Sequence, residues 1–331
     1  DRVDEAPSLE NPRDRAAMVA SNLRSCASRL KDGTTVYLDD VESDDAVRLA
    51  IDALRAAAEP TATIGTAVFQ AWERLQTDPV LSRVRVLRSD VSRLLLTWHR
   101  GGWWIDADVV CIDDFEDALL GPAMHSAITE AWNHRRQAGA PQGCLFAWEG
   151  ELSAPPSAPL QWAFGCPPHH KFLAHALQHV AHRITSWTQD TTPAGLPAPE
   201  FGARVQVGQS TVLVPVLWLT GPTAIGEALS SFALQSMKPA MELSAVLQTV
   251  RESFGERVDD HTTWDRVSVV GHDATDAVIL LPYCFFRSRG CPHLMQRFGD
   301  KVLFHHEFDT AWRTSFWHNY FTPPAKPQRE R

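Results

Sequence analysis

The sequence has no concentration of positive charge and no apolar run long enough to cross a bilayer. Its 331 residues include 31 Lys and Arg against 40 Asp and Glu, a formal net charge of −9, and basic residues gather only between 326 and 331. Binding to a phosphate backbone needs a basic face, so we do not expect nucleic acid as a partner. Because no stretch of about 18 apolar residues is present, no segment of this chain is predicted to span a membrane.

The chain also lacks the usual marks of export and of metal binding by cysteine. Residues 1–10 are acidic and polar, unlike a signal peptide, and no Asn begins an Asn-x-Ser/Thr sequon. The six Cys residues show no C-x-x-C spacing. Cys284 and Cys291 could close a short loop through a disulfide, but free buried thiols are an equal alternative, and the redox compartment stays open.

Apolar periodicity predicts both helices and strands along the chain. Helices are expected over residues 14–31, 43–58, 90–99 and 170–187, and Gly101-Gly102 is expected to end the third of them as a C-cap. Strands are expected over residues 34–38, 84–87, 212–219 and 278–281.

The alternation of these elements indicates an α/β fold with a mostly parallel central sheet. Residues 133–160 are rich in Gly, Pro and Ala and are expected to be irregular, as a lid or acceptor loop would be. Residues 188–204 read as a Pro/Gly linker. We expect one domain over residues 14–321, preceded by an arm over residues 1–13 and followed by a tail over residues 322–331.

Two carboxylates one residue apart interrupt an apolar stretch. Asp106 and Asp108 follow Trp103-Trp104-Ile105 and precede Val109-Val110-Cys111-Ile112, although Asp is depleted from strands and costly to bury unpaired. Side chains at i and i+2 point to one side of an extended segment, and where the strand leaves the sheet they offer two oxygen ligands to Mg²⁺ or Mn²⁺. Such an ion, bridged to substrate phosphates, indicates an enzyme that uses a sugar nucleotide. Two solvated carboxylates at a strand end are the alternative.

A second charged pair precedes this motif. Asp90 and Arg93 are spaced i and i+3, so they share one face of the helix before the Asp106 strand. One side chain can accept hydrogen bonds from sugar hydroxyls while the other donates to phosphate or hydroxyl oxygens. On spacing alone, an intrahelical ion pair explains the two residues better.

Together these segments resemble the signature of the DXD-containing glycosyltransferase family 32. The resemblance is dense over residues 88–114, where Ser89-Asp90, Arg93, Gly101-Gly102 and Asp106-Ala107-Asp108 match, and looser elsewhere. Four further segments are similar to the other motifs of the family and follow in its order: Gln161–His169, Trp218–Pro222, Leu280-Leu281-Pro282 with Phe285-Phe286, and His305-His306 followed by Trp312.

The resemblance implies a GT-A fold, in which a single Rossmann-like domain binds the nucleotide sugar and holds the metal at the strand ends. Asp106 and Asp108 would hold the ion with the nucleotide diphosphate, and Asp90 and Arg93 would contact the donor sugar. By role, the resemblance implies catalysis by Asp90, Arg93 and Asp108, metal binding by Asp106, Asp108, His305 and His306, and nucleotide binding by Asp106, Asp108, Gly221 and Trp312.

The same resemblance implies a retaining transferase that moves a hexose from a nucleotide diphosphate sugar to a hydroxyl of a glycan or glycolipid. GDP-mannose is the favoured donor and a UDP-sugar the second. The chain begins without Met, so an anchor could have been removed; in that case we expect the lumen of the Golgi or of the secretory pathway.

Two other functions stay open at this point. A catalytically inactive glycosyltransferase-like binding or scaffold subunit is favoured by departures from the family pattern, namely Trp103-Trp104-Ile105, Gln161 and no apolar strand before residue 14. A metallohydrolase built on Asp106, Asp108 and the His305-His306 pair is weaker, because such enzymes usually show more His and Asp motifs at fixed spacing.

Overall fold

The computed structural model describes residues 12–29, 36, 40–111, 126, 128–129, 143–147, 159–188, 202–236, 268–271, 273, 275–281 and 304–306. Several sequence predictions lie outside these residues: Cys284, Cys291, Trp312, the arm before residue 12, the tail after residue 321 and most of the strand predicted over residues 34–38. Within the described part, no helix is both long enough and apolar enough to cross a membrane.

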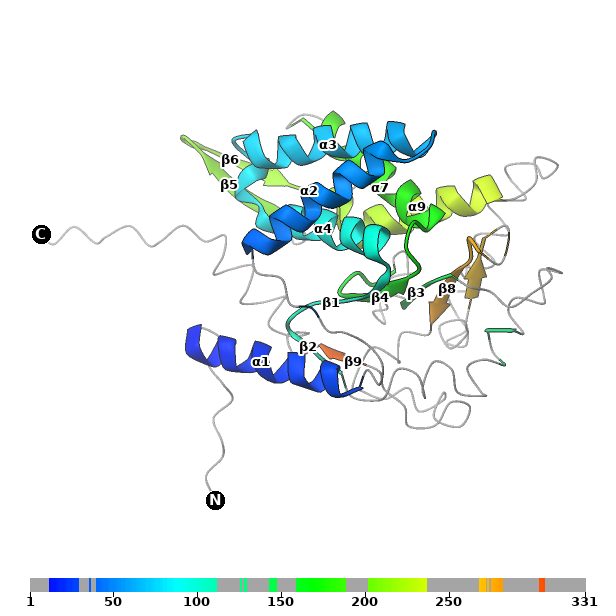
Figure 1. Cartoon of the computed structure of the whole chain (residues 1–331). Helices are drawn as coiled ribbons and strands as arrows, with labels where there is room; N and C mark the ends of the chain where they lie inside the picture. Colours follow the sequence, from blue (N-terminus) through cyan, green and yellow to red (C-terminus); the bar gives the residue numbers. More distant parts are fainter. Residues whose placement is uncertain are drawn as a thin grey trace, which may run out of the picture.

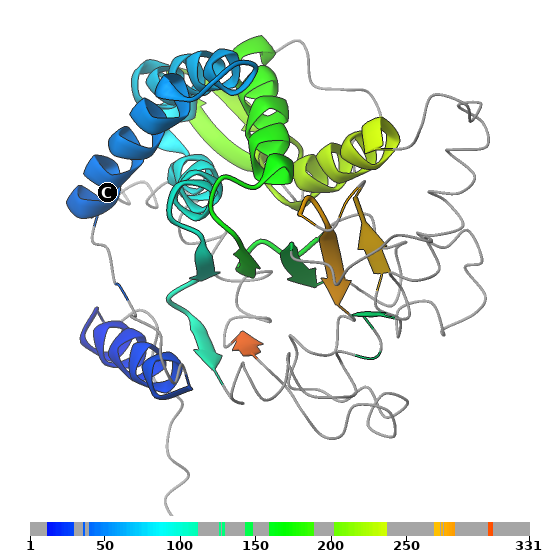
Figure 2. The same cartoon turned by 45° about the vertical axis from the view of Figure 1, so that its right-hand side comes forward.

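The helices form a layer against the central sheet. Their apolar side chains recur every three or four residues, so each buries one face, and Leu54, Leu75 and Leu94 have no exposed surface. Helices α2, α3, α4, α7 and α9 lie together on one side of the sheet in both views (Figure 1, Figure 2). The bounds of the helices are Pro12–Arg29 for α1, Asp40–Ala56 for α2, Thr61–Thr77 for α3, Arg85–Arg100 for α4, Lys171–Ser186 for α7, Val216–Leu219 for α8 and Pro222–Ser236 for α9.

The central sheet has five strands in the order β1-β4-β3-β8-β7. The α/β class is therefore confirmed, but the expected mostly parallel sheet is wrong, because only β3 and β8 run parallel and the other neighbours in this sheet are antiparallel. Strands β4 and β8 are buried along their whole length, and a strand buried on both faces reads as an apolar run in either direction. The strands span Gly102–Ile105 for β1, Cys144–Ala147 for β3, Ala163–Cys166 for β4, Ser268–Val270 for β7 and Val278–Leu281 for β8.

Two smaller strand pairs complete the described structure. Strand β5 (Ala203–Val207) and strand β6 (Ser210–Val214) form a hairpin, and β2 (Val109–Cys111) pairs antiparallel with β9 (Phe304–His306). Helix α1 lies beside β2, away from the other helices (Figure 2). A disulfide between Cys26 of α1 and Cys111 of β2 joins these two elements.

Four sequence predictions of local structure need correction. The strand expected over residues 84–87 is wrong, because α4 begins at Arg85 and Leu87, Val91 and Leu94 lie on its buried face. The strand expected over residues 212–219 ends at Val214, since Pro215 cannot donate to a ladder and precedes α8.

The other two corrections concern segments for which the sequence predicted no helix or strand. Helix α3 was not predicted, although Ile64, Val68, Ala71 and Leu75 form its buried stripe. Strand β3 lies within residues 133–160, which were expected to be irregular, and it occupies the centre of the sheet.

The predicted glycine cap of α4 is confirmed. Gly101 has φ of 69° and its N–H donates to the carbonyl oxygen of Thr97 at 2.8 Å. Gly102, with φ of 89°, follows at once and begins β1. Both residues adopt the left-handed region that favours glycine, and the pair turns the chain from α4 into the sheet.

We predict that Gly101→Ala is more destabilising than Gly102→Ala. Both changes force alanine into a positive φ, at a cost of about 1–2 kcal/mol. A Cβ at Gly101 would also lie 2.6 Å from Cδ of Pro168, whereas a Cβ at Gly102 meets nothing within 4 Å. Urea unfolding of the two variants measures the difference in the free energy of unfolding. Equal losses would show that the contact with Pro168 relaxes freely.

Candidate functional site

The buried face of α4 carries an ion pair. Asp90 and Arg93 are 4% and 7% exposed, and Nη2 of Arg93 lies 3.2 Å from Oδ1 of Asp90. The shared helix face predicted from their spacing is confirmed. Both side chains are buried, so little of their surface is open to a ligand. Their contact with a donor sugar stays a prediction.

Arg93 also contacts the first carboxylate of the Asp-Ala-Asp motif. Its Nη2 lies 3.4 Å from Oδ2 of Asp106, and the other oxygen, Oδ1, accepts a hydrogen bond of 2.7 Å from the indole Nε1 of Trp104. The backbone N–H of Asp106 donates to the carbonyl oxygen of Trp162 at 2.8 Å. These contacts fix Asp106 at the point where β1 ends.

The second carboxylate follows in the turn between β1 and β2. The N–H of Val109 donates to the carbonyl oxygen of Asp106 at 3.1 Å, which closes this turn. Asp108 is partly exposed and Ala107 is exposed at the tip. From the other side, the Nδ2 amide of Asn22 donates to the carbonyl oxygen of Ala107 at 3.2 Å, so α1 supports the turn.

A buried threonine completes the surroundings of Asp90. The hydroxyl of Thr220, which has no exposed surface, donates to Oδ2 of Asp90 at 2.6 Å. The carbonyl oxygen of Thr220 accepts from Nε2 of Gln161 at 3.0 Å. The resemblance implied a nucleotide-binding role for Gly221 in this segment but gave the Thr220 side chain no role; a hydroxyl residue between an apolar helix and a Gly-Pro step was the available signal.

The charges in this cluster shift the pKa values of its members. Burial raises the pKa of the Asp90 carboxyl, and this rise is opposed by Arg93 and by the hydrogen bond from Thr220. Burial alone would lower the pKa of the Arg93 guanidinium, but Asp106, Asp90 and Asp108 outweigh burial and raise it. Arg93 is therefore held in its charged form by three carboxylates.

The pairing of β2 with β9 places the two predicted metal ligands, His305 and His306, next to the strand that follows Asp108. Val109 pairs with His306 and Val110 with His305, so residues about 200 positions apart in the sequence become neighbours directly after Asp108. The pairing of β2 with β9 thus brings these two backbone segments together. Metal binding by the two histidines stays a prediction.

Gly221 is the remaining predicted site residue among those that the structure describes. Gly221 is buried, and a Cβ at this position would lie 2.7 Å from Cα of Leu217. The backbone at Gly221 therefore lies too close to α8 for any side chain. The predicted contact of Gly221 with a nucleotide stays a prediction.

Comparison of the chain with protein-family models and with curated proteins finds no match. The resemblance to glycosyltransferase family 32 therefore stays an expectation from the sequence motifs.

We predict that Thr220→Val destabilises the protein more than Thr220→Ser. Valine removes the hydroxyl that donates to the buried Asp90 carboxylate, which we expect to cost about 1.5–3 kcal/mol. Serine keeps that donor and loses one buried methyl, at about 1 kcal/mol. Urea unfolding at neutral pH gives both values, and an equal loss in the two variants would contradict a stabilising role for the hydrogen bond.

Proposed function

We propose that this chain is a metal-dependent, retaining hexosyltransferase of the glycosyltransferase family 32 type, with a GT-A fold. Its donor would be a nucleotide diphosphate sugar, with GDP-mannose favoured over a UDP-sugar, and its acceptor a hydroxyl of a glycan or glycolipid. The fold class and the order of the motifs support this function. The observation that carries it is the cluster of three carboxylates around one guanidinium.

Two members of that cluster have the donor atoms that a hard divalent cation prefers. Asp106 and Asp108 offer carboxylate oxygens, while the buried Asp90 pairs with the Arg93 guanidinium. The side chain of Asp106 is 24% exposed and Asp108 is partly exposed, so both residues can be reached from solvent. Mg²⁺ and Mn²⁺ prefer such oxygen ligands with water and phosphate completing the shell.

In this proposal Asp106 and Asp108 hold the ion, and the residues behind them hold Asp106. When bound, Mn²⁺ or Mg²⁺ would neutralise the negative charge of the diphosphate leaving group. Arg93 fixes one oxygen of Asp106 and the Trp104 indole fixes the other. Asp90 keeps Arg93 in place, since a buried guanidinium needs a paired carboxylate.

A catalytically inactive binding or scaffold subunit is the second candidate. The ion pair between Arg93 and Asp106 favours it, because Arg93 already engages an oxygen that a metal ion would otherwise use. The same cluster would then stabilise the fold and hold no ion.

An activity assay tests the transferase directly. The protein is incubated with Mn²⁺ and a panel of nucleotide sugars, and released nucleoside diphosphate is measured. We expect turnover of at least one donor, and a loss of about 100-fold or more in Asp108→Asn, because an ion that stabilises the leaving group contributes several kcal/mol. Asp52→Asn, a change at an exposed residue of α2, is the matched control and keeps full activity. No turnover of any donor by the wild type would exclude the enzyme.

Calorimetry with GDP and UDP, with and without Mn²⁺, separates the two candidates. A transferase is expected to bind one of the nucleotides more tightly when Mn²⁺ is present. Binding of neither nucleotide under both conditions would favour the scaffold subunit.

A further prediction concerns the indole that contacts Asp106. Trp104→Phe removes the Nε1 donor while keeping an aromatic ring, and we expect affinity for Mn²⁺ to fall about tenfold, since a hydrogen bond to a carboxylate contributes roughly 1.5 kcal/mol. Trp103→Phe is the control, because that ring packs on Gly165 of the neighbouring strand. Calorimetric titration with Mn²⁺ measures both variants. Equal affinities would show that the indole does not orient the ligand.

A further inference from the structure

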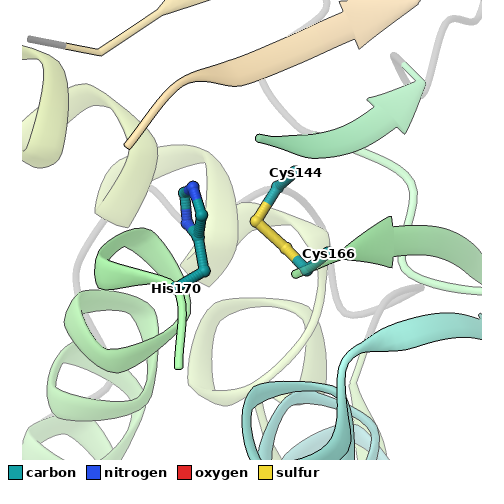
Figure 3. Close-up of side chains that lie close together, drawn as sticks. All are labelled: Cys144, Cys166 and His170. Carbon is teal, nitrogen blue, oxygen red and sulfur yellow. A yellow bond between two sulfur atoms is a disulfide. The ribbon is translucent and has the colours of Figure 1, made fainter. Parts of the chain in front are cut away.

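Three side chains of metal-binding type converge at a second place in the fold. Cys144 of β3, Cys166 at the end of β4 and His170 at the start of α7 lie with their ligand atoms within 4.8 Å of one another (Figure 3). All three are buried, with exposed fractions of 0%, 5% and 4%. The two sulfurs form a disulfide, and the imidazole lies beside it.

We propose that reduction of this disulfide converts Cys144, Cys166 and His170 into a binding site for a thiophilic cation such as Zn²⁺. The disulfide and the metal site are then alternative states of the same three side chains. This site is separate from the carboxylate cluster, and its soft ligands suit a different class of ion from Mg²⁺ or Mn²⁺.

The sheet keeps the two sulfurs together whether or not they are bonded. Strands β3 and β4 run antiparallel with Leu145 opposite Gly165, which places Cys144 opposite Cys166. The Cα atoms of the two cysteines are 4.0 Å apart. Because backbone pairing sets this distance, the thiols stay adjacent after reduction and are preorganised as two ligands.

The conversion balances in electrons, protons and charge. A dithiol reductant supplies two electrons and two protons, which break the S–S bond and give two thiols, and the reductant leaves as a disulfide. Binding of Zn²⁺ then releases both thiol protons. Two thiolates and one Zn²⁺ carry no net charge, so the occupied site avoids the cost of burying an uncompensated ion.

His170 is the third ligand in its neutral form. Burial is the main cause that lowers the pKa of its imidazole to about 4, so the ring is uncharged at neutral pH and can bind a cation. Its Nδ1 accepts a hydrogen bond from the N–H of Phe172 at 3.2 Å. Its buried Nε2 makes no hydrogen bond of good geometry among the described residues, and the backbone of Ala277 lies near enough to oppose the fall in the pKa of the ring.

Ligation through Nε2 requires the ring proton to move to Nδ1. The cap hydrogen bond from Phe172 is then lost. That loss is small compared with the free energy that a structural zinc site supplies.

The other disulfide provides an internal control. Within the part of the chain that the structure describes, Cys144, Cys166 and His170 form the one group of three candidate ligands that lie this close together. The pair Cys26 and Cys111 belongs to no such group. Reduction opens both pairs, but among the described residues a third candidate ligand lies beside the first pair alone.

Metal binding is tested in a Cys284→Ser, Cys291→Ser background, so that only the four described cysteines remain. The protein is reduced with a dithiol, freed of reductant without oxygen and titrated with Co²⁺ and then Zn²⁺. We expect one equivalent of Co²⁺ with a thiolate-to-cobalt charge-transfer band, displacement by Zn²⁺, and neither in the oxidised protein. Adding Cys26→Ser and Cys111→Ser should keep the band, and adding Cys144→Ser and Cys166→Ser should abolish it.

Two further measurements make the outcome decisive. His170→Asn keeps a side chain that can cap α7 and should weaken Co²⁺ binding at least about tenfold. If reduction unfolds the protein, Zn²⁺ should restore its circular dichroism. The proposed site is overturned if reduced protein shows no thiolate band, if Cys144→Ser with Cys166→Ser leaves the band unchanged, or if reduced protein stays unfolded with Zn²⁺.

Discussion

Burial of the Arg93 guanidinium is the constraint around which the candidate site is arranged. A cation taken out of water is stable only when carboxylates and good geometry compensate it. Here Asp90 comes from the same helix, while Asp106 comes from the end of β1. Helix α4 and the strand that follows it are consequently fixed relative to each other by charge as well as by the glycine turn between them. The acidic turn at the surface is therefore supported by contacts with buried residues.

Connections from three other parts of the chain reinforce that turn. Thr220, just after α8, donates to Asp90, and Gln161 before β4 donates to Thr220. On the opposite side, Asn22 reaches the turn, and the Cys26 disulfide ties α1 to β2. The carboxylates thus lie at the end of β1, where segments that are far apart in sequence meet.

The sequence predicted what depends on local spacing. The Asp90 and Arg93 pair, the Gly101 cap and the helices over α2 and α7 follow from intervals of three or four residues or from single-residue chemistry, and they are present in the structure. Strand direction and the roles of Thr220, Gln161 and Trp104 were not predictable, because they depend on which segments meet across the fold. An apolar run such as β8 carries no mark of its partner, and a buried threonine looks like any other threonine until its neighbour is known.

The pairing of β2 with β9 has a consequence for how the molecule is made. Val110 cannot meet its partner at His305 until about 200 further residues have left the ribosome, and closing so long a loop carries an entropic cost that short-range contacts do not. Helices α2, α3 and α4 follow one another in the sequence and can pack together early. Strand β2, which follows Asp108, lacks its partner β9 until the end of the chain is made. During synthesis, the strand that follows the carboxylate pair is therefore among the last of the described elements to meet its partner.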